Sequence, residues 1–263
     1  MEKENALKVP LKEQENLKEL FLLLEQNGME QEKKQVVQMV DYIDGIETKM
    51  EEVLSQLTEM REQLSGIENK GVCANVEKIV EAVSGRMDDA KQALENLKQA
   101  FLGKVEQALQ AGKSKGRKAL SGIIQASLLP RMTFRVQRLL QMAIVKADQG
   151  IEKLGNIADE FHAAKQHMGN ARRALTGKKI KQISSRDPEK GVIFEIQKQM
   201  FQGLMFMEQM ERRTENLLKK MDLLTARDEK ARTSVRESIQ ELKSDQQTSS
   251  GIPQRQKNEP VRG

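Results

Sequence analysis

The chain of 263 residues contains no Trp, one Tyr and seven Phe, and its 44 Lys and Arg residues against 39 Asp and Glu residues give a formal net charge of +5. Large aromatic side chains carry much of the packing in globular cores. This composition therefore argues against a broad globular core and predicts a narrow one made of Leu, Ile, Val, Met and Ala. Cys73 is the single cysteine, which excludes an intrachain disulfide and predicts a buried, inert thiol.

The first predicted helix begins at Pro10 and ends at Asn27-Gly28, because proline suits the first turn of a helix and glycine suits its end. One apolar face runs along this helix with the spacing i, i+3, i+4, i+7. That face consists of Leu17, Leu20, Phe21 and Leu24.

The second predicted helix carries the most regular pattern in the chain, an unbroken 3-4 alternation of apolar residues that is typical of a coiled-coil seam. We expect Asn69-Lys70-Gly71 to end this helix. Val40 and Leu54 widen the apolar stripe, which indicates packing against more than one helix. The seam consists of Val36, Met39, Ile43, Ile46, Met50, Val53, Leu57, Met60, Leu64 and Ile67.

A third helix is expected from about Ala74 to Gln110, and a glycine- and lysine-rich break from Gly112 to Gly116 follows it. A fourth helix is expected to begin after Pro130 and to end at Thr176-Gly177. Both helices continue the 3-4 spacing, although the fourth has Lys165 and Arg172 at core-phase positions. Polar residues there either set the register of the bundle or face water, and facing water is the simpler interpretation.

Residues 178–186 form a predicted basic linker, and Asp187-Pro188-Glu189 is a typical helix start. The last helix is expected to run to about Lys243, with Thr214, Asp228 and Ser238 as polar interruptions of its seam. The remaining residues have almost nothing to bury and are expected to be disordered.

The predicted fold is all-α: an elongated antiparallel helical bundle or coiled coil of four to five long helices with a disordered C-terminal tail. Alternating β-branched runs that would indicate strands are not found. The predicted regions are an acidic helical region at 1–72, a basic central region at 73–183, a long helix at 184–243 and the tail at 244–263.

The central region is basic because no acidic residue occurs between Glu106 and Asp148. Three arginines there share a helical face at i, i+4 and i+7, and Met132, Val136, Leu139, Leu140 and Ala143 line the other face. The candidate basic interaction face consists of Lys113, Lys115, Arg117, Lys118, Arg131, Arg135 and Arg138.

Three kinds of partner fit this basic face. The first is protein, either the acidic N-terminal third of the same or another copy, or a different protein. The second is nucleic acid, where Lys and Arg clusters give salt-sensitive affinity for phosphates. The third is an anionic membrane surface. Phe134 is the one aromatic residue within the patch, so the stacking that supports single-strand binding is largely missing.

Catalytic, metal and cofactor motifs are not recognised, and neither a cofactor nor a small-molecule substrate is expected. Gly112-Lys113-Ser114 lacks the upstream glycine of a phosphate-binding loop, because Gln107 occupies that position. His162 and His167 are five residues apart, which on a helix points them to different faces. Cys73 has no recognisable activating base. We therefore expect a protein that is not an enzyme.

Two stretches, residues 17–57 and 155–178, resemble uncharacterised helical proteins carried by Gram-positive bacteria, often on conjugative or other mobile elements. The resemblance implies a mobile-element setting and assigns no site residues. The first residues have no apolar run typical of a secretory signal, and the longest apolar stretch, 120–129, is shorter than the roughly 20 residues that a membrane span needs. We therefore expect a cytoplasmic helical scaffold or accessory protein that binds other proteins or itself.

Overall fold

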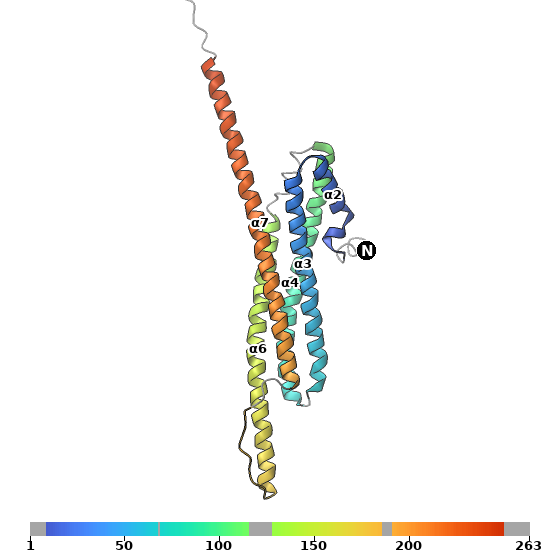
Figure 1. Cartoon of the computed structure of the whole chain (residues 1–263), viewed down its shortest axis with the longest axis vertical. Helices are drawn as coiled ribbons and strands as arrows, with labels where there is room; N and C mark the ends of the chain where they lie inside the picture. Colours follow the sequence, from blue (N-terminus) through green and yellow to red (C-terminus); the bar gives the residue numbers. More distant parts are fainter. Residues whose placement is uncertain (1–8, 68, 116–127, 186–190, 250–263) are drawn as a thin grey trace, which may run out of the picture. The chain divides into compact units, whose positions relative to one another are not determined.

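The structure, a computed structural model, describes residues 9–67, 69–115, 128–185 and 191–249, and side chains are described only through Asp222 and not for residues 112–128. The described residues form five α-helices and two 3-10 turns and contain no strand (Figure 1), which confirms the all-α fold class. The elements are η1 (Leu11–Glu13), α2 (Glu15–Gln26), α3 (Glu30–Gln63), η2 (Leu64–Gly66), α4 (Lys70–Lys115), α6 (Leu128–Leu175) and α7 (Val192–Ser249).

The chain divides into two units, Met1–Met221 and Asp222–Gly263. The predicted regions 1–72 and 73–183 both belong to the first unit, together with the start of the region 184–243. In the second unit the structure describes helical backbone as far as Ser249.

Within the first unit, α3, α4, α6 and α7 pack as antiparallel neighbours. The connection between α3 and α4 is short and contains the 3-10 turn η2, and the chain reverses direction across it. Gly150 of α6 lies against Ile79 of α4 and Met200 of α7, so that these three helices meet at one level. At another level the Thr133 hydroxyl of α6 lies 3.8 Å from the Met221 sulfur of α7, which makes α6 and α7 antiparallel.

The interface between α3 and α7 is antiparallel by the same reasoning. Gly66, just after α3, approaches Val192 at the start of α7, and Gly45 near the middle of α3 lies under the Arg213 side chain. The topology of the first unit is therefore up-down-up-down, in which successive helices are antiparallel neighbours.

The 3-4 repeat of α3 faces the interior of this bundle. Nine of its ten positions are buried and the tenth, Ile67, is half-buried beyond the end of the helix. Val40 is also buried and Leu54 is half-buried, so the apolar stripe is wider than a two-stranded seam requires. At the typical rise of about 1.5 Å per residue, α3 carries this stripe over about 50 Å.

Glycines end two of the helices as expected. Gly28 and Gly177 have φ values of 65° and 67°, in the left-handed region that favours glycine. After α2 the Gly28 and Met29 amides donate to the Glu25 and Leu24 carbonyls, at 2.9 Å each. This is the Schellman pattern, and the accompanying apolar contact comes from Leu24 and Met29, both buried.

Asn69-Lys70-Gly71 begins a helix rather than ending one, so this prediction was wrong. The Asn69 side-chain oxygen accepts hydrogen bonds from the backbone amides of Gly71 and Val72 at 3.0 and 3.1 Å. Asparagine is a favoured N-cap residue because its side chain satisfies amides that the first turn leaves unpaired. The preceding helix ends earlier, at Gln63, and continues as one 3-10 turn.

Other predicted boundaries also shift. The backbone of α4 remains helical through Lys115, so the predicted break at Gly112 is not a helix end, and α6 begins two residues before Pro130. Proline is compatible with the first helical turn, where its missing N–H has no partner to lose. The predicted start at Asp187 lies outside the described residues, and α7 extends past Lys243 to Ser249. Residues 250–263 of the predicted tail also lie outside them.

Candidate functional site

The outward face of α6 combines cations with exposed apolar side chains. At 100° per residue, one stripe of the helix collects six residues within about 100° of arc. Phe134 is 58% exposed, Val145 52% and Met142 38%, and the three arginines between them are also exposed. We call this stripe the α6 surface: Arg131, Phe134, Arg135, Arg138, Met142 and Val145.

The opposite face of α6 anchors it in the bundle. Val136, Leu140 and Ala143 are buried. The buried Thr133 hydroxyl donates a hydrogen bond to the Leu129 carbonyl at 3.0 Å. Met132 and Leu139 are half-buried at the border. The helix is thus amphipathic within the folded protein, and the α6 surface points away from the core.

The predicted pairing of these arginines with the acidic N-terminal third is not found within the described part of the chain, where none of the three forms an ion pair. Two of them, Arg131 and Arg135, instead flank a groove between α6 and α4. The groove is lined by Ala93, Asn96, Gln99, Ala100, Arg131, Met132 and Arg135. Pairing between two copies of the chain is left as a proposal.

The remaining residues of the predicted basic face are placed only in part. Lys113 and Lys115 belong to the last turn of α4, and nothing is described of their side chains. Arg117 and Lys118 lie outside the described residues. Sequence reasoning did not include Met142 and Val145 in the face, although their spacing of four and seven residues from Arg138 places them on it.

A buried ion pair joins α3 to α4. The Lys98 side chain is fully buried, and its ammonium donates to both carboxylate oxygens of Glu47 at 2.6 and 2.7 Å. Burial raises the pKa of Glu47 above its ordinary value of 4.5, and the Lys98 ammonium opposes this rise. The 3-4 repeat assigns the core position to the neighbouring Leu97, so the sequence pattern did not point to Lys98.

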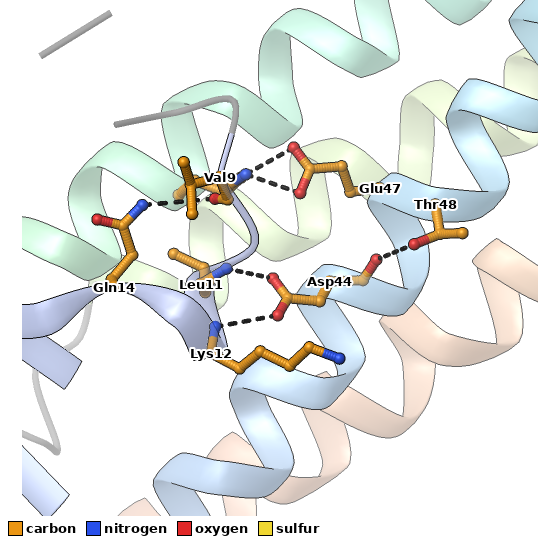
Figure 2. A network of polar contacts seen from close by, with 8 residues as sticks. Val9, Leu11, Lys12, Gln14, Asp44, Glu47 and Thr48 are labelled. Atoms are coloured by element: carbon orange, nitrogen blue, oxygen red, sulfur yellow. Dashed lines mark hydrogen bonds and ion pairs between the residues drawn. The ribbon is translucent and has the colours of Figure 1, made fainter. Parts of the chain in front are cut away.

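The N-terminal segment lies over α3 beside this pair. The Asp44 carboxylate accepts hydrogen bonds from the Leu11 and Lys12 amides at 2.8 and 3.2 Å, which satisfies the start of η1. Figure 2 shows Asp44 and Glu47 projecting from α3 toward this segment. Leu11 is fully buried under the turn. Asp44 thus satisfies two backbone amides and Leu11 fills space in the core, so this arrangement has a structural role.

Groups with catalytic or metal-binding potential are not brought together in the part of the chain that the structure describes. No cluster of three His, Cys, Asp or Glu residues there could hold a metal ion. His162 contacts Gln166 on its own helix, whereas His167 is exposed. The half-buried Cys73 thiol donates to the Leu64 carbonyl at 3.5 Å.

None of the helices, over the described residues, combines the length and apolar character required to cross a bilayer. A small apolar void of about 20 Å³ lies between α2, α3, α4 and α6. A void of that size, lined mainly by aliphatic and aromatic side chains, is a packing defect rather than a ligand site.

Comparison with known proteins places the chain in one family. A family model described as "Family of unknown function (DUF6674)" matches residues 13–262, and the chain belongs to that family. No curated protein and no solved structure matches it. The class is therefore an all-helical bundle of a family whose role is open, and the α6 surface is its candidate interaction site.

Proposed function

We propose that the protein is a non-enzymatic helical scaffold or accessory protein that binds another protein, or a second copy of itself, through the α6 surface. The observation that carries the proposal is the exposure of Phe134, Met142 and Val145 on the same stripe as three arginines that have no ion pair in the described chain. Phe, Met and Arg are enriched at protein interfaces, whereas Lys is depleted.

The same composition favours a protein partner over nucleic acid. Contacts to phosphates are electrostatic and need no exposed aliphatic side chains, whereas a protein partner buries them. Since the α6 surface carries three cations and no carboxylate, the partner surface is expected to be apolar with acidic residues around it. The acidic N-terminal region of a second copy offers the carboxylates that such a surface needs.

A photo-crosslinking amino acid at Phe134 tests the proposal in the native host. We expect a protein adduct at this site, and we expect Arg135→Glu with Arg138→Glu to remove it. The matched control is the same amino acid at Phe201 of α7, which is 53% exposed and lies outside the α6 surface. Light scattering of the purified chain shows whether the partner is a second copy.

The proposal is wrong if the Phe134 site gives no adduct beyond those of the Phe201 site. A gel-shift titration with duplex DNA across salt concentrations tests the competing function. Binding at low salt that weakens when Arg131, Arg135 and Arg138 become Gln assigns the face to nucleic acid instead.

The biological setting is also a proposal. The resemblance of residues 17–57 and 155–178 to helical proteins of Gram-positive mobile elements supports an accessory role in such an element, in the cytoplasm. Fluorescence microscopy of a tagged chain tests the cytoplasmic location. Measuring transcription of the gene during element transfer tests the accessory role.

A further inference from the structure

The last part of α6 and the segment after it form a hairpin that exposes apolar side chains. Residues 178–185, here called the returning segment, fold back along α6 after the turn at Thr176-Gly177. No side chain between residues 159 and 185 is buried. Four apolar side chains are instead exposed there: Leu175 by 89%, Met168 by 72%, Ile180 by 66% and Ile183 by 45%.

Side-chain amides hold the returning segment in place. Gln166 donates to the Ser184 carbonyl and accepts from the Ser184 amide, both at 2.8 Å. One helical turn later, Asn170 makes the same reciprocal pair with Lys181, at 2.7 and 2.9 Å. Each side-chain amide thus pairs with a backbone N–H and C=O, as a neighbouring strand would. The returning segment is therefore ordered, and its apolar side chains are exposed in that ordered conformation.

The hairpin carries one sign of charge. No acidic residue occurs between Glu160 and Asp187, and all six cations of the described range 161–185 lie on the hairpin. Five of them lie within four residues of the turn, on both sides of Leu175 and Ile180. The cations are Lys165, Arg172, Arg173, Lys178, Lys179 and Lys181.

This charge distribution argues against a second copy as the partner. On α6 the core-phase positions after Phe161 alternate cation and apolar residue: Lys165, Met168, Arg172, Leu175. A symmetric pairing of two hairpins would bring the six cations of one copy close to the six of the other with no acidic residue between them, which is unfavourable. The surface requires a partner that is both anionic and apolar.

A bilayer with anionic headgroups has that chemistry. Its phosphates attract Lys and Arg near the surface, and its acyl region accepts small apolar side chains that project from a turn. A nucleic acid would satisfy the cations and leave Leu175 and Ile180 in water. Among residues 161–185 the half-buried Phe161 is the one Phe, Tyr or Trp side chain, so stacking is largely missing. The binding would be peripheral.

We propose that the hairpin of residues 161–185 docks on an anionic membrane surface, with Leu175 and Ile180 inserted at the interface and Arg172, Arg173, Lys178 and Lys179 on the headgroups. This site is separate from the α6 surface and does not depend on the function proposed for it.

Co-sedimentation of the full chain with vesicles tests the proposal. We expect binding to equal parts of phosphatidylcholine and phosphatidylglycerol, and none to phosphatidylcholine alone. Lys178→Gln with Lys179→Gln should lower the partition coefficient about thirtyfold, since each lysine near an anionic surface contributes about fivefold. Leu175→Ser and Ile180→Ser should each lower it about tenfold. Arg131→Gln with Arg135→Gln, on the α6 surface, is the matched control and should bind fully.

An environment-sensitive fluorophore reports insertion directly. In a Cys73→Ser background, the label at Leu175→Cys should shift to the blue on anionic vesicles, whereas the same label at Ala82→Cys on α4 should not. Apart from the half-buried Cys73, all substituted side chains are exposed, so circular dichroism should show unchanged helicity. The proposal is overturned if anionic vesicles bind no protein. It is also overturned if the hairpin variants bind as well as the unchanged chain, or if binding is lost only in the α6-surface variant.

Discussion

The glycine at position 150 allows three helices to approach one another, and replacing it should be costly. A Cβ atom at Gly150 would lie 2.8 Å from the Ile79 Cγ2 atom and 2.9 Å from the Met200 sulfur. Ordinary carbon contacts lie at about 3.5–4.0 Å, so both neighbours must move by about 1 Å. Met200 can adapt because its chain is flexible. Ile79 is β-branched and stiff at χ1, so it resists the shift.

The magnitude follows from two opposing effects. Replacing glycine by alanine inside a helix stabilises it by about 1 kcal/mol. Overpacking a core typically costs about 1–3 kcal/mol. We therefore expect Gly150→Ala to lower the free energy of unfolding by about 1 kcal/mol. Gly103→Ala on α4, where nothing lies within 4 Å of the added atom, should raise it by about 1 kcal/mol.

Urea unfolding followed by circular dichroism at 222 nm measures both variants under the same conditions. Gly85→Ala is a second control, because its Cβ also meets nothing within 4 Å. Combining Gly150→Ala with Ile79→Ala should recover part of the loss, since the stiff neighbour is then removed. The packing argument is refuted if Gly150→Ala proves as stable as Gly103→Ala.

Three further predictions concern polar contacts. Lys98→Met leaves the half-buried Glu47 carboxylate without its ammonium partner. At neutral pH we expect the free energy of unfolding, measured in urea, to fall by about 2 kcal/mol. This loss is low for a broken buried ion pair because the Glu47 side chain is 24% exposed. Burial raises the pKa of the Glu47 carboxyl in the folded state and the Lys98 ammonium opposes that rise, so Lys98→Met should raise this pKa further. The loss should therefore shrink as the pH falls and Glu47 becomes protonated in the variant, and a pH-independent loss would contradict the assignment. Asp44→Ala removes the acceptor for two amides of the N-terminal turn and should cost about 1 kcal/mol, with faster amide exchange confined to that turn. Gln166→Ala should speed exchange of the Ser184 amide by about tenfold without changing global stability, and equal exchange in both proteins would show that the returning segment is held by other contacts.

The bundle could be predicted because the repeat of α3 is regular. A side chain every 3.5 residues on one face must be covered along the whole helix. The short connection after α3 then makes α4 its antiparallel neighbour, whereas the longer connections on either side of α6 carry no such signal. The same reasoning failed at Asn69, since asparagine favours both helix ends and helix starts. Only the two backbone amides that donate hydrogen bonds to the Asn69 side chain identify it as a helix start. The positions of these amides depend on the path of the chain.

The candidate site could be predicted in part. Arg131, Arg135 and Arg138 were expected on one exposed face, and they are exposed in the structure. Exposed Met142 and Val145 could not be separated from core residues by composition, because hydrophobic side chains are usually assigned to the interior. The pairing of Lys98 with Glu47, 51 residues apart, has no local pattern at all. Lys98 can be buried in α4 because the carboxylate that pairs with it, Glu47, belongs to α3.

The pair of Lys98 and Glu47 has a consequence for the alignment of α3 and α4. Apolar side chains in a 3-4 repeat can interdigitate almost equally well after one helix slides past the other by a heptad. Such a slide would carry the ammonium about 10 Å away from the carboxylate, at about 1.5 Å per residue, and strand a charge inside the protein. The buried ion pair therefore disfavours every axial offset between α3 and α4 except the one in which Lys98 and Glu47 meet.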